Sequence, residues 1–131
     1  MKKLCFILTL ALFGQFSSAN EVNVYTSRHY DSDPGLYQEF TNETGVKVNI
    51  ISGKGSALLE RIKAEGKNSP ADIFFTVDAG NLWKVQKENL LQSITSKRVL
   101  DAVPDNLKGP DNQWTAIAKR ARAIFYNPLM V

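Results

Sequence analysis

Cysteine and histidine are scarce in this chain, and no apolar run is long enough to cross a membrane. The 131 residues include one cysteine, Cys5, and one histidine, His29. Cys5 lies in an amino-terminal apolar segment that we expect to be removed, so the remaining chain offers no disulfide and no thiolate. A transmembrane helix requires about 20 apolar residues, and no stretch approaches that length. A chain of this size ordinarily forms one domain, which packing must stabilise.

The first 19 residues have the features of a secretory signal peptide. Lys2 and Lys3 supply a positive start, residues 4–13 are almost wholly apolar, and Ser17-Ser18-Ala19 places small residues before a cleavage site. We therefore expect residues 1–19 to be a signal peptide. The mature protein would then be exported and soluble, with no membrane insertion after the signal is removed.

Neither sign of charge dominates the expected mature chain. Removing Lys2 and Lys3 lowers the number of lysines and arginines from 16 to 14, against 13 acidic residues, which leaves a net charge of about +1. A nucleic-acid-binding protein would carry a concentrated basic face. The composition therefore predicts no nucleic-acid partner.

Strand and helix signals alternate along the first half of the mature chain. Short apolar segments predict strands, and a proline or glycine marks each helix start and end. The expected strands are residues 22–25, 46–51 and 71–77. The first expected helix has Asp33 as its cap and Pro34 as its first residue and ends at Gly45, and the second begins near Ser56 and ends at Gly66. This βαβαβ order predicts an α/β fold with a parallel sheet and right-handed crossovers.

The second half of the chain has weaker signals. Asp78 is expected to cap a helix that carries Leu82, Trp83 and Val85, and a short helix is expected near residues 96–103. Two prolines and a glycine predict a loop over residues 104–112. Residues 114–126 resemble one long strand or two joined strands, in which Arg120 and Arg122 would share a face.

One edge of the predicted sheet is the expected place for a site, because open parallel sheets bind ligands beyond the carboxyl ends of their strands. Residues 26–32, 52–56 and 78–81 would meet there, and His29 and Tyr30 lie on the first of these loops. A tyrosine phenolate is a hard anionic donor suited to ferric iron, and imidazole also binds iron. The alternative is a surface histidine beside an aromatic ring that packs on the next helix. From spacing alone, both interpretations stay open.

Two further groups of residues could bind an anion, or could be ordinary surface and turn residues. Arg120 and Arg122 could hold an anion through bidentate hydrogen bonds, or could be surface arginines on a sheet edge. Gly53-Lys54-Gly55-Ser56 could form an anion nest, but an ordinary tight turn is favoured because the phosphate-loop pattern is absent.

A catalytic interpretation has little support. Ser27, His29 and Asp31 lie within five residues, but neighbouring loop positions seldom converge into a nucleophile, base and orienting acid. The chain contains no GxSxG or HExxH pattern. We therefore expect that the protein is not an enzyme.

Five segments together resemble the amino-terminal half of periplasmic ferric-ion-binding proteins, the substrate-binding components of iron ABC importers. These segments are VNVYTSRHY, FTNETGVKV, LLERIKAEG, SPADIFFTVD and KRARAIFYNP. The resemblance implies an α/β fold with a mainly parallel sheet, here an incomplete lobe of the type II periplasmic-binding-protein kind. Residues 20–131 would be the truncated amino-terminal lobe of a two-lobed, periplasmic solute-binding protein. Its cargo would be ferric iron and its partner an inner-membrane ABC permease.

The same resemblance assigns roles to individual residues. His29 and Tyr30 match positions where one subgroup of the family places a histidine and a tyrosine that face the metal. Arg120 matches an arginine that binds a synergistic anion such as carbonate, with Arg122 as its supporting neighbour. Other members place a ligating glutamate in a TEQ sequence, where this chain has Thr76-Val77-Asp78. Because valine cannot ligate a metal, the chain resembles the tyrosine-rich subgroup.

The chain departs from the family in length. The family uses an adjacent pair of tyrosines from the second lobe, which lies beyond residue 131, so we expect a fragment or a truncated reading frame that alone binds iron weakly or not at all. The alternatives are a receptor for another small solute, such as a polyamine or an inorganic anion, and a small exported enzyme without a transport role.

Overall fold

A three-stranded sheet forms the centre of the structure. The computed structural model describes residues 20–119, 121 and 123–130. The strands are β1 (Glu21–Thr26), β2 (Lys47–Ser52) and β3 (Ile73–Phe75), in the order β2-β1-β3. Both neighbours run parallel to β1, with Val24 opposite Ile50 and Ile73. The predicted parallel sheet is therefore confirmed, and the carboxyl ends of all three strands lie at one edge.

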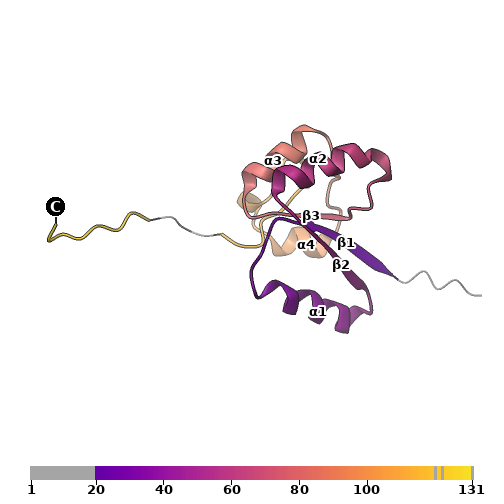
Figure 1. Ribbon diagram of the computed structural model, residues 1–131, viewed down its shortest axis with the longest axis horizontal. Coiled ribbons are helices and arrows are strands. Elements are labelled where there is room, and N and C mark those ends of the chain that lie inside the picture. Colours follow the sequence, from indigo (N-terminus) through magenta and orange to yellow (C-terminus); the bar gives the residue numbers. More distant parts are fainter. Residues whose placement is uncertain (1–19, 120, 122, 131) are drawn as a thin grey trace, which may run out of the picture.

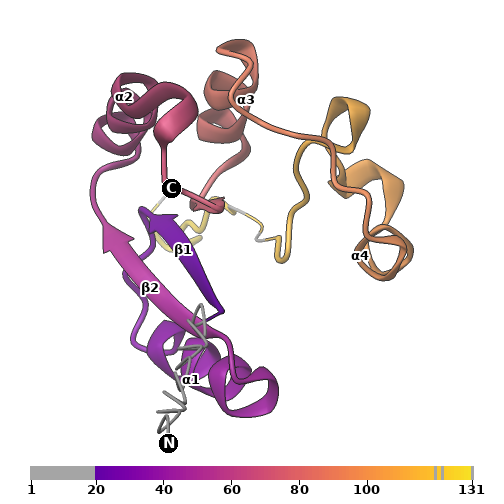
Figure 2. The same ribbon diagram turned by 90° about the vertical axis from the view of Figure 1, so that its right-hand side faces the viewer.

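Helices cover both faces of this sheet. Figure 1 shows α1 (Asp33–Thr44) on one face, and α2 (Gly55–Glu65) and α3 (Ala79–Lys87) on the other. The shorter α4 (Lys97–Ala102) lies beyond the β3 side of the sheet (Figure 2). Single 3-10 turns occupy Gly66–Asn68, Asp105–Leu107 and Pro110–Asn112. The last two turns lie where the sequence predicted an irregular loop. Within the described residues, no helix is long and apolar enough to span a bilayer.

Glycine and aspartate fix the helix ends, as the sequence predicted. Gly45 ends α1 with a φ of 72°, a left-handed conformation that costs glycine little, and its N–H donates to the Thr41 carbonyl. Gly66 ends α2 with a φ of 57°. Asp78 caps α3 by accepting a hydrogen bond from the Asn81 N–H at 2.9 Å. The expected cap of α1 differs, because the cap residue is Ser32 and Asp33 is the first residue of the helix.

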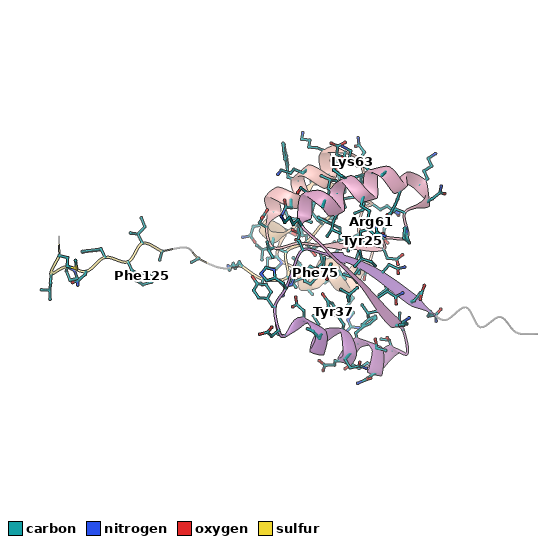
Figure 3. All side chains as sticks on the ribbon, viewed as in Figure 1. Tyr25, Tyr37, Arg61, Lys63, Phe75 and Phe125 are labelled. Atoms are coloured by element: carbon teal, nitrogen blue, oxygen red, sulfur yellow. The ribbon has the colours of Figure 1, made fainter. Side chains whose placement is uncertain are left out.

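The core lies between the sheet and α2. Tyr25 of β1 packs with Leu58 and Ile62 of α2, and all three are buried. The Tyr25 hydroxyl donates to Glu65 at 2.9 Å, and the Arg61 guanidinium lies 4.9 Å from the centre of the Tyr25 ring. Figure 3 shows Tyr25 and Arg61 beneath α2. Burial, followed by the bond to Glu65, raises the pKa of Tyr25.

The opposite face of the sheet is less covered. Tyr37 of α1 is half-buried on this side (Figure 3), whereas Leu36 and Phe40 of the same helix remain exposed. The Tyr37 hydroxyl is buried without a hydrogen-bond partner among the described residues, and burial raises its pKa. The side of α1 that carries Leu36, Tyr37 and Phe40 is thus only partly packed.

The predicted strand over residues 114–126 is wrong for the part of this segment that the structure describes. Among the described residues, the only β pairing in this segment is an isolated antiparallel bridge between Lys108 and Thr115. The segment then leads away from the sheet, and Phe125 lies far from the core (Figures 1 and 3). A strand requires a hydrogen-bonded neighbour, and the described residues beyond Ala116 have no such pairing. Apolar alternation alone was therefore an insufficient signal.

Candidate functional site

Three loops meet at the carboxyl edge of the sheet, as the sequence predicted. The loop after β1 is tied to both neighbouring strands, because the Ser27 N–H donates to the Phe75 carbonyl and the Gly53 N–H donates to the Thr26 carbonyl, each at 3.0 Å. The Ser27 hydroxyl lies 2.9 Å from that of Thr76, and Asn81 donates to the same Thr76 oxygen at 3.1 Å. This network makes a continuous rim, which we call the strand-end rim: residues 26–32, 52–56 and 76–81.

His29 and Tyr30 lie side by side on the strand-end rim. Their rings are stacked, with centres 5.9 Å apart and planes inclined by 13°. Tyr30 is 45% exposed. Both residues line a hollow of about 420 Å³ between the rim and α1, which also includes Tyr37. The two candidate donors thus share one hollow instead of pointing to separate parts of the molecule.

The Arg28 side chain lies directly behind Tyr30. Its guanidinium carbon is 4.7 Å from the centre of the Tyr30 ring and 4.5 Å from that of Phe75. The Asp33 carboxylate accepts two hydrogen bonds from the same group, from Nη2 at 2.7 Å and from Nε at 3.1 Å. The side chains of Arg28 and Asp33 are only 18% and 9% exposed. Arg28 is therefore held by two aromatic faces and a bidentate ion pair.

The charges of this pair support each other. The hydrogen bond from Arg28 lowers the pKa of the Asp33 carboxyl, and the same bond raises the pKa of Arg28. Both groups are therefore ionised at neutral pH. The negative charge of Asp33 is held below the rim, and the positive charge of Arg28 lies against the Tyr30 ring.

A second hollow adjoins Tyr30 on its other side. Its volume is about 500 Å³, and Arg28 and Tyr30 line it together with residues 74–79 and 114–119. Tyr30 thus belongs to the walls of both hollows. Lys119 lies in this wall, whereas Arg120 and Arg122, the predicted anion-binding residues, lie outside the described residues.

His29 and Tyr30 are the metal ligands predicted at the strand-end rim. Among the described residues, no group of three or more histidine, cysteine, aspartate and glutamate side chains could hold a metal ion. His29 offers an imidazole nitrogen, and Tyr30 offers a phenol oxygen that has no hydrogen-bond partner among those residues. Phenolate favours hard cations such as ferric iron.

The other candidates at the rim have structural roles. The Ser27 hydroxyl is bonded to Thr76, so no Ser27–His29 pair forms a nucleophile and base. At the turn after β2, a Cβ on Gly53 would lie 3.2 Å from the Leu58 side chain, and one on Gly55 would lie 3.1 Å from Asn81. Close packing therefore accounts for these glycines without an anion.

Sequence reasoning missed Arg28 and Asp33. Arg28 was given no role of its own beside His29 and Tyr30, and Asp33 was expected only to cap a helix. The sequence does place an arginine and an aspartate five residues apart across a short loop. This spacing alone does not predict an ion pair, because pairing also depends on the backbone conformation of the loop.

The chain is similar to proteins of known type. Residues 26–129 match the family described as bacterial extracellular solute-binding protein. Iron uptake protein A1 of Synechocystis sp. is 50% identical over 107 residues, which cover 82% of this chain and 30% of that protein. The major ferric iron-binding protein of Neisseria gonorrhoeae is 30% identical over 125 residues, covering 92% of this chain and 37% of the relative. The chain therefore spans about a third of the length of these relatives.

Solved structures of related proteins are also similar to this chain. A Trichodesmium protein in complex with iron and citrate ligands is 53% identical, with a TM-score of 0.70 over 73% of this chain and 30% of that chain. A ferric binding protein from Campylobacter jejuni is 41% identical, with a TM-score of 0.71 over the same shares. The predicted fold class, an incomplete α/β lobe of the type II periplasmic-binding-protein kind, is confirmed.

Proposed function

The chain belongs to the bacterial extracellular solute-binding protein family, and we propose that it is part of a receptor that captures ferric iron and delivers it to an inner-membrane ABC permease. Residues 20–131 would form the amino-terminal lobe of that receptor, and residues 1–19 would be the signal peptide that directs it to the periplasm. Relatives named for iron uptake and ferric-iron binding support this proposal.

The observation that carries the proposal is the placement of His29 and Tyr30. They are stacked on each other at the end of the central strand, they share a hollow, and the phenol oxygen has no competing partner among the described residues. Ligands commonly bind at this edge of an open parallel sheet. We assign both side chains as metal ligands.

Iron binding at this rim requires the loss of a proton. Tyrosine binds a metal as phenolate, so the phenolic proton is released when iron binds. Acid therefore opposes binding, and affinity should fall as the pH is lowered. Release of the cargo needs no covalent chemistry, and we propose that the protein acts by ligation and handover without turnover.

Two side chains are too few to hold ferric iron tightly. We attribute the remaining positions to water, to groups outside residues 1–131, and to a synergistic anion such as carbonate, bound by Arg120 with Arg122 beside it. Each ligand group that is already fixed in place before binding reduces the entropy lost on binding. Since the rim of this chain fixes only two, we expect the chain alone to bind iron weakly.

A colour titration tests the proposal. The full chain, titrated with ferric nitrilotriacetate at neutral pH, should develop the visible charge-transfer band of ferric phenolate. Tyr30→Phe should abolish the band, whereas Tyr37→Phe, which removes a buried hydroxyl from the same hollow, should retain it. Since weak binding still gives the band at excess iron, a wild-type chain that stays colourless there would contradict iron ligation at this rim and favour a receptor for a polyamine or an inorganic anion. A band that persists in Tyr30→Phe would refute the ligand assignment.

A further inference from the structure

Tyr30 is linked to Asp33 directly through its backbone and indirectly, by way of Arg28, through its ring. The Asp33 N–H donates to the Tyr30 carbonyl at 3.0 Å, which fixes the backbone of the loop to the first turn of α1. The Asp33 carboxylate also holds the Arg28 guanidinium, which lies 4.7 Å from the Tyr30 ring centre. The backbone of Asp33 thus holds the peptide of Tyr30, and its side chain holds the arginine that contacts the Tyr30 ring.

Arg28 itself has little freedom to move. The Arg28 N–H donates to the hydroxyl of Thr26, which is buried in the central strand, at 3.0 Å. Its guanidinium lies between two aromatic faces and makes two hydrogen bonds to a single carboxylate. A planar guanidinium fixed in this way has little conformational freedom left to lose when a neighbouring group binds a ligand. Arg28 is therefore a rigid support for the Tyr30 ring.

We propose that Arg28, held by Asp33, is a positioning residue that presents the Tyr30 phenol to ferric iron. This inference rests on the proposed function, because it takes Tyr30 to be a metal ligand. Arg28 does not touch the metal. It supports one face of the ring, leaves the phenol oxygen without a hydrogen-bond partner among the described residues, and holds a positive charge 4.7 Å from the ring centre.

A second arginine–tyrosine pair in the chain provides a contrast. Arg61 lies 4.9 Å from the centre of the Tyr25 ring and is paired with Glu65 at 2.7 Å, so it too contacts a tyrosine ring and a carboxylate, although its side chain is 51% exposed and that of Arg28 is 18% exposed. Tyr25, however, is completely buried, and its hydroxyl is bonded to Glu65. The same arrangement therefore serves only the core at Tyr25, whereas at Tyr30 it leaves the hydroxyl available to a ligand.

The first experiment observes the ring without iron. The full chain carrying ring-labelled tyrosine is compared by NMR in its wild-type, Arg28→Lys and Arg61→Lys forms. Lysine keeps the charge but loses the planar stacking and the bidentate pairing. We expect Arg28→Lys to shift the Tyr30 ring signals and leave those of Tyr25 unchanged, and Arg61→Lys to do the reverse.

The second experiment measures iron binding in the same variants with ferric nitrilotriacetate. Residues that orient a metal ligand typically contribute about tenfold or more to metal affinity. We therefore expect half-saturation of the charge-transfer band at about tenfold higher iron in Arg28→Lys, and no change in Arg61→Lys. If Arg28→Lys does not fold, Asp33→Asn replaces it, because asparagine has nearly the same shape and leaves Arg28 in place but loosely held. Asp33→Asn should shift the Tyr30 ring signals and raise the iron concentration at half-saturation, as expected for Arg28→Lys.

The outcomes separate this inference from the proposed function. A folded Arg28→Lys variant with unchanged Tyr30 signals and unchanged half-saturation would overturn the positioning role, while the iron-binding role would stand. A wild-type chain without a Tyr30-dependent band would overturn both. Tyr30 signals that shift without any change in half-saturation would show that Arg28 supports the ring for packing alone, and would also overturn the inference.

Discussion

Replacing Asp33 by asparagine should destabilise the fold by about 2 kcal/mol. Breaking a fully buried ion pair costs about 3–5 kcal/mol, because the partner charge is left uncompensated. The Arg28 and Asp33 side chains are 18% and 9% exposed, so some solvent screening remains. Asparagine can still accept one hydrogen bond, and bonds to charged groups contribute about 1.5–3 kcal/mol. These considerations place the cost below that of a fully buried pair.

Urea unfolding, followed by far-UV circular dichroism at neutral pH, measures this cost. Asp101→Asn is the matched control, since the Lys97–Asp101 pair has the same 2.7 Å separation but side chains that are 87% and 62% exposed. Exposed pairs contribute less than about 1 kcal/mol. Equal free energies of unfolding for the two variants would refute the argument that burial makes the Arg28–Asp33 pair important.

The effect of Asp33→Asn should also depend on pH. The hydrogen bond from Arg28 lowers the pKa of Asp33 in the folded state below its unfolded value. A group shifted in this direction stabilises the fold above its unfolded pKa, and this stabilisation is lost as the pH falls through the folded pKa. The difference between wild type and Asp33→Asn should thus be constant near neutral pH and shrink below about pH 4. A difference that grows in acid would contradict the sign of the shift.

Three other substitutions and one control test the fold. Leu58→Ala, in the buried core, should lower the free energy of unfolding by about 2–4 kcal/mol in urea titrations, whereas Leu36→Ala on the exposed side of α1 should change it by less than about 0.5 kcal/mol. Gly45→Ala should cost about 1 kcal/mol from its φ of 72° alone, because no atom lies within 4 Å of the added methyl group; a stabilised variant would exclude a left-handed Gly45. Asp78→Ala should cost about 1 kcal/mol by removing the cap of α3, and an unchanged unfolding midpoint would show that this cap is not formed.

Local sequence signals predicted the sheet and its helices well. The prolines, glycines and aspartates that mark helix ends act through their own backbone preferences, so Gly45, Gly66 and Asp78 were identifiable without tertiary information. The resemblance to ferric-ion-binding proteins is likewise confirmed by the relatives. The strand predicted over residues 114–126 was wrong for the residues of that segment that the structure describes, because a strand depends on its neighbour as well as on its own sequence.

The candidate site was predictable only in outline. Parallel topology places the loop of His29 and Tyr30 at the carboxyl edge of the sheet, and the structure has it there. The support behind Tyr30 was not predictable, because the contact of Arg28 with Phe75 depends on how two strands lie side by side. The ligand roles of His29 and Tyr30, and the anion-binding role of Arg120, remain predictions.

The location of bound iron tests the central claim most directly. A crystal structure of the full chain, soaked in ferric nitrilotriacetate and measured at the iron absorption edge, gives the position of the metal from its anomalous scattering. The account predicts a peak within bonding distance of the Tyr30 phenol oxygen, with the His29 ring beside it. A peak elsewhere on the surface, with none at Tyr30, would contradict it.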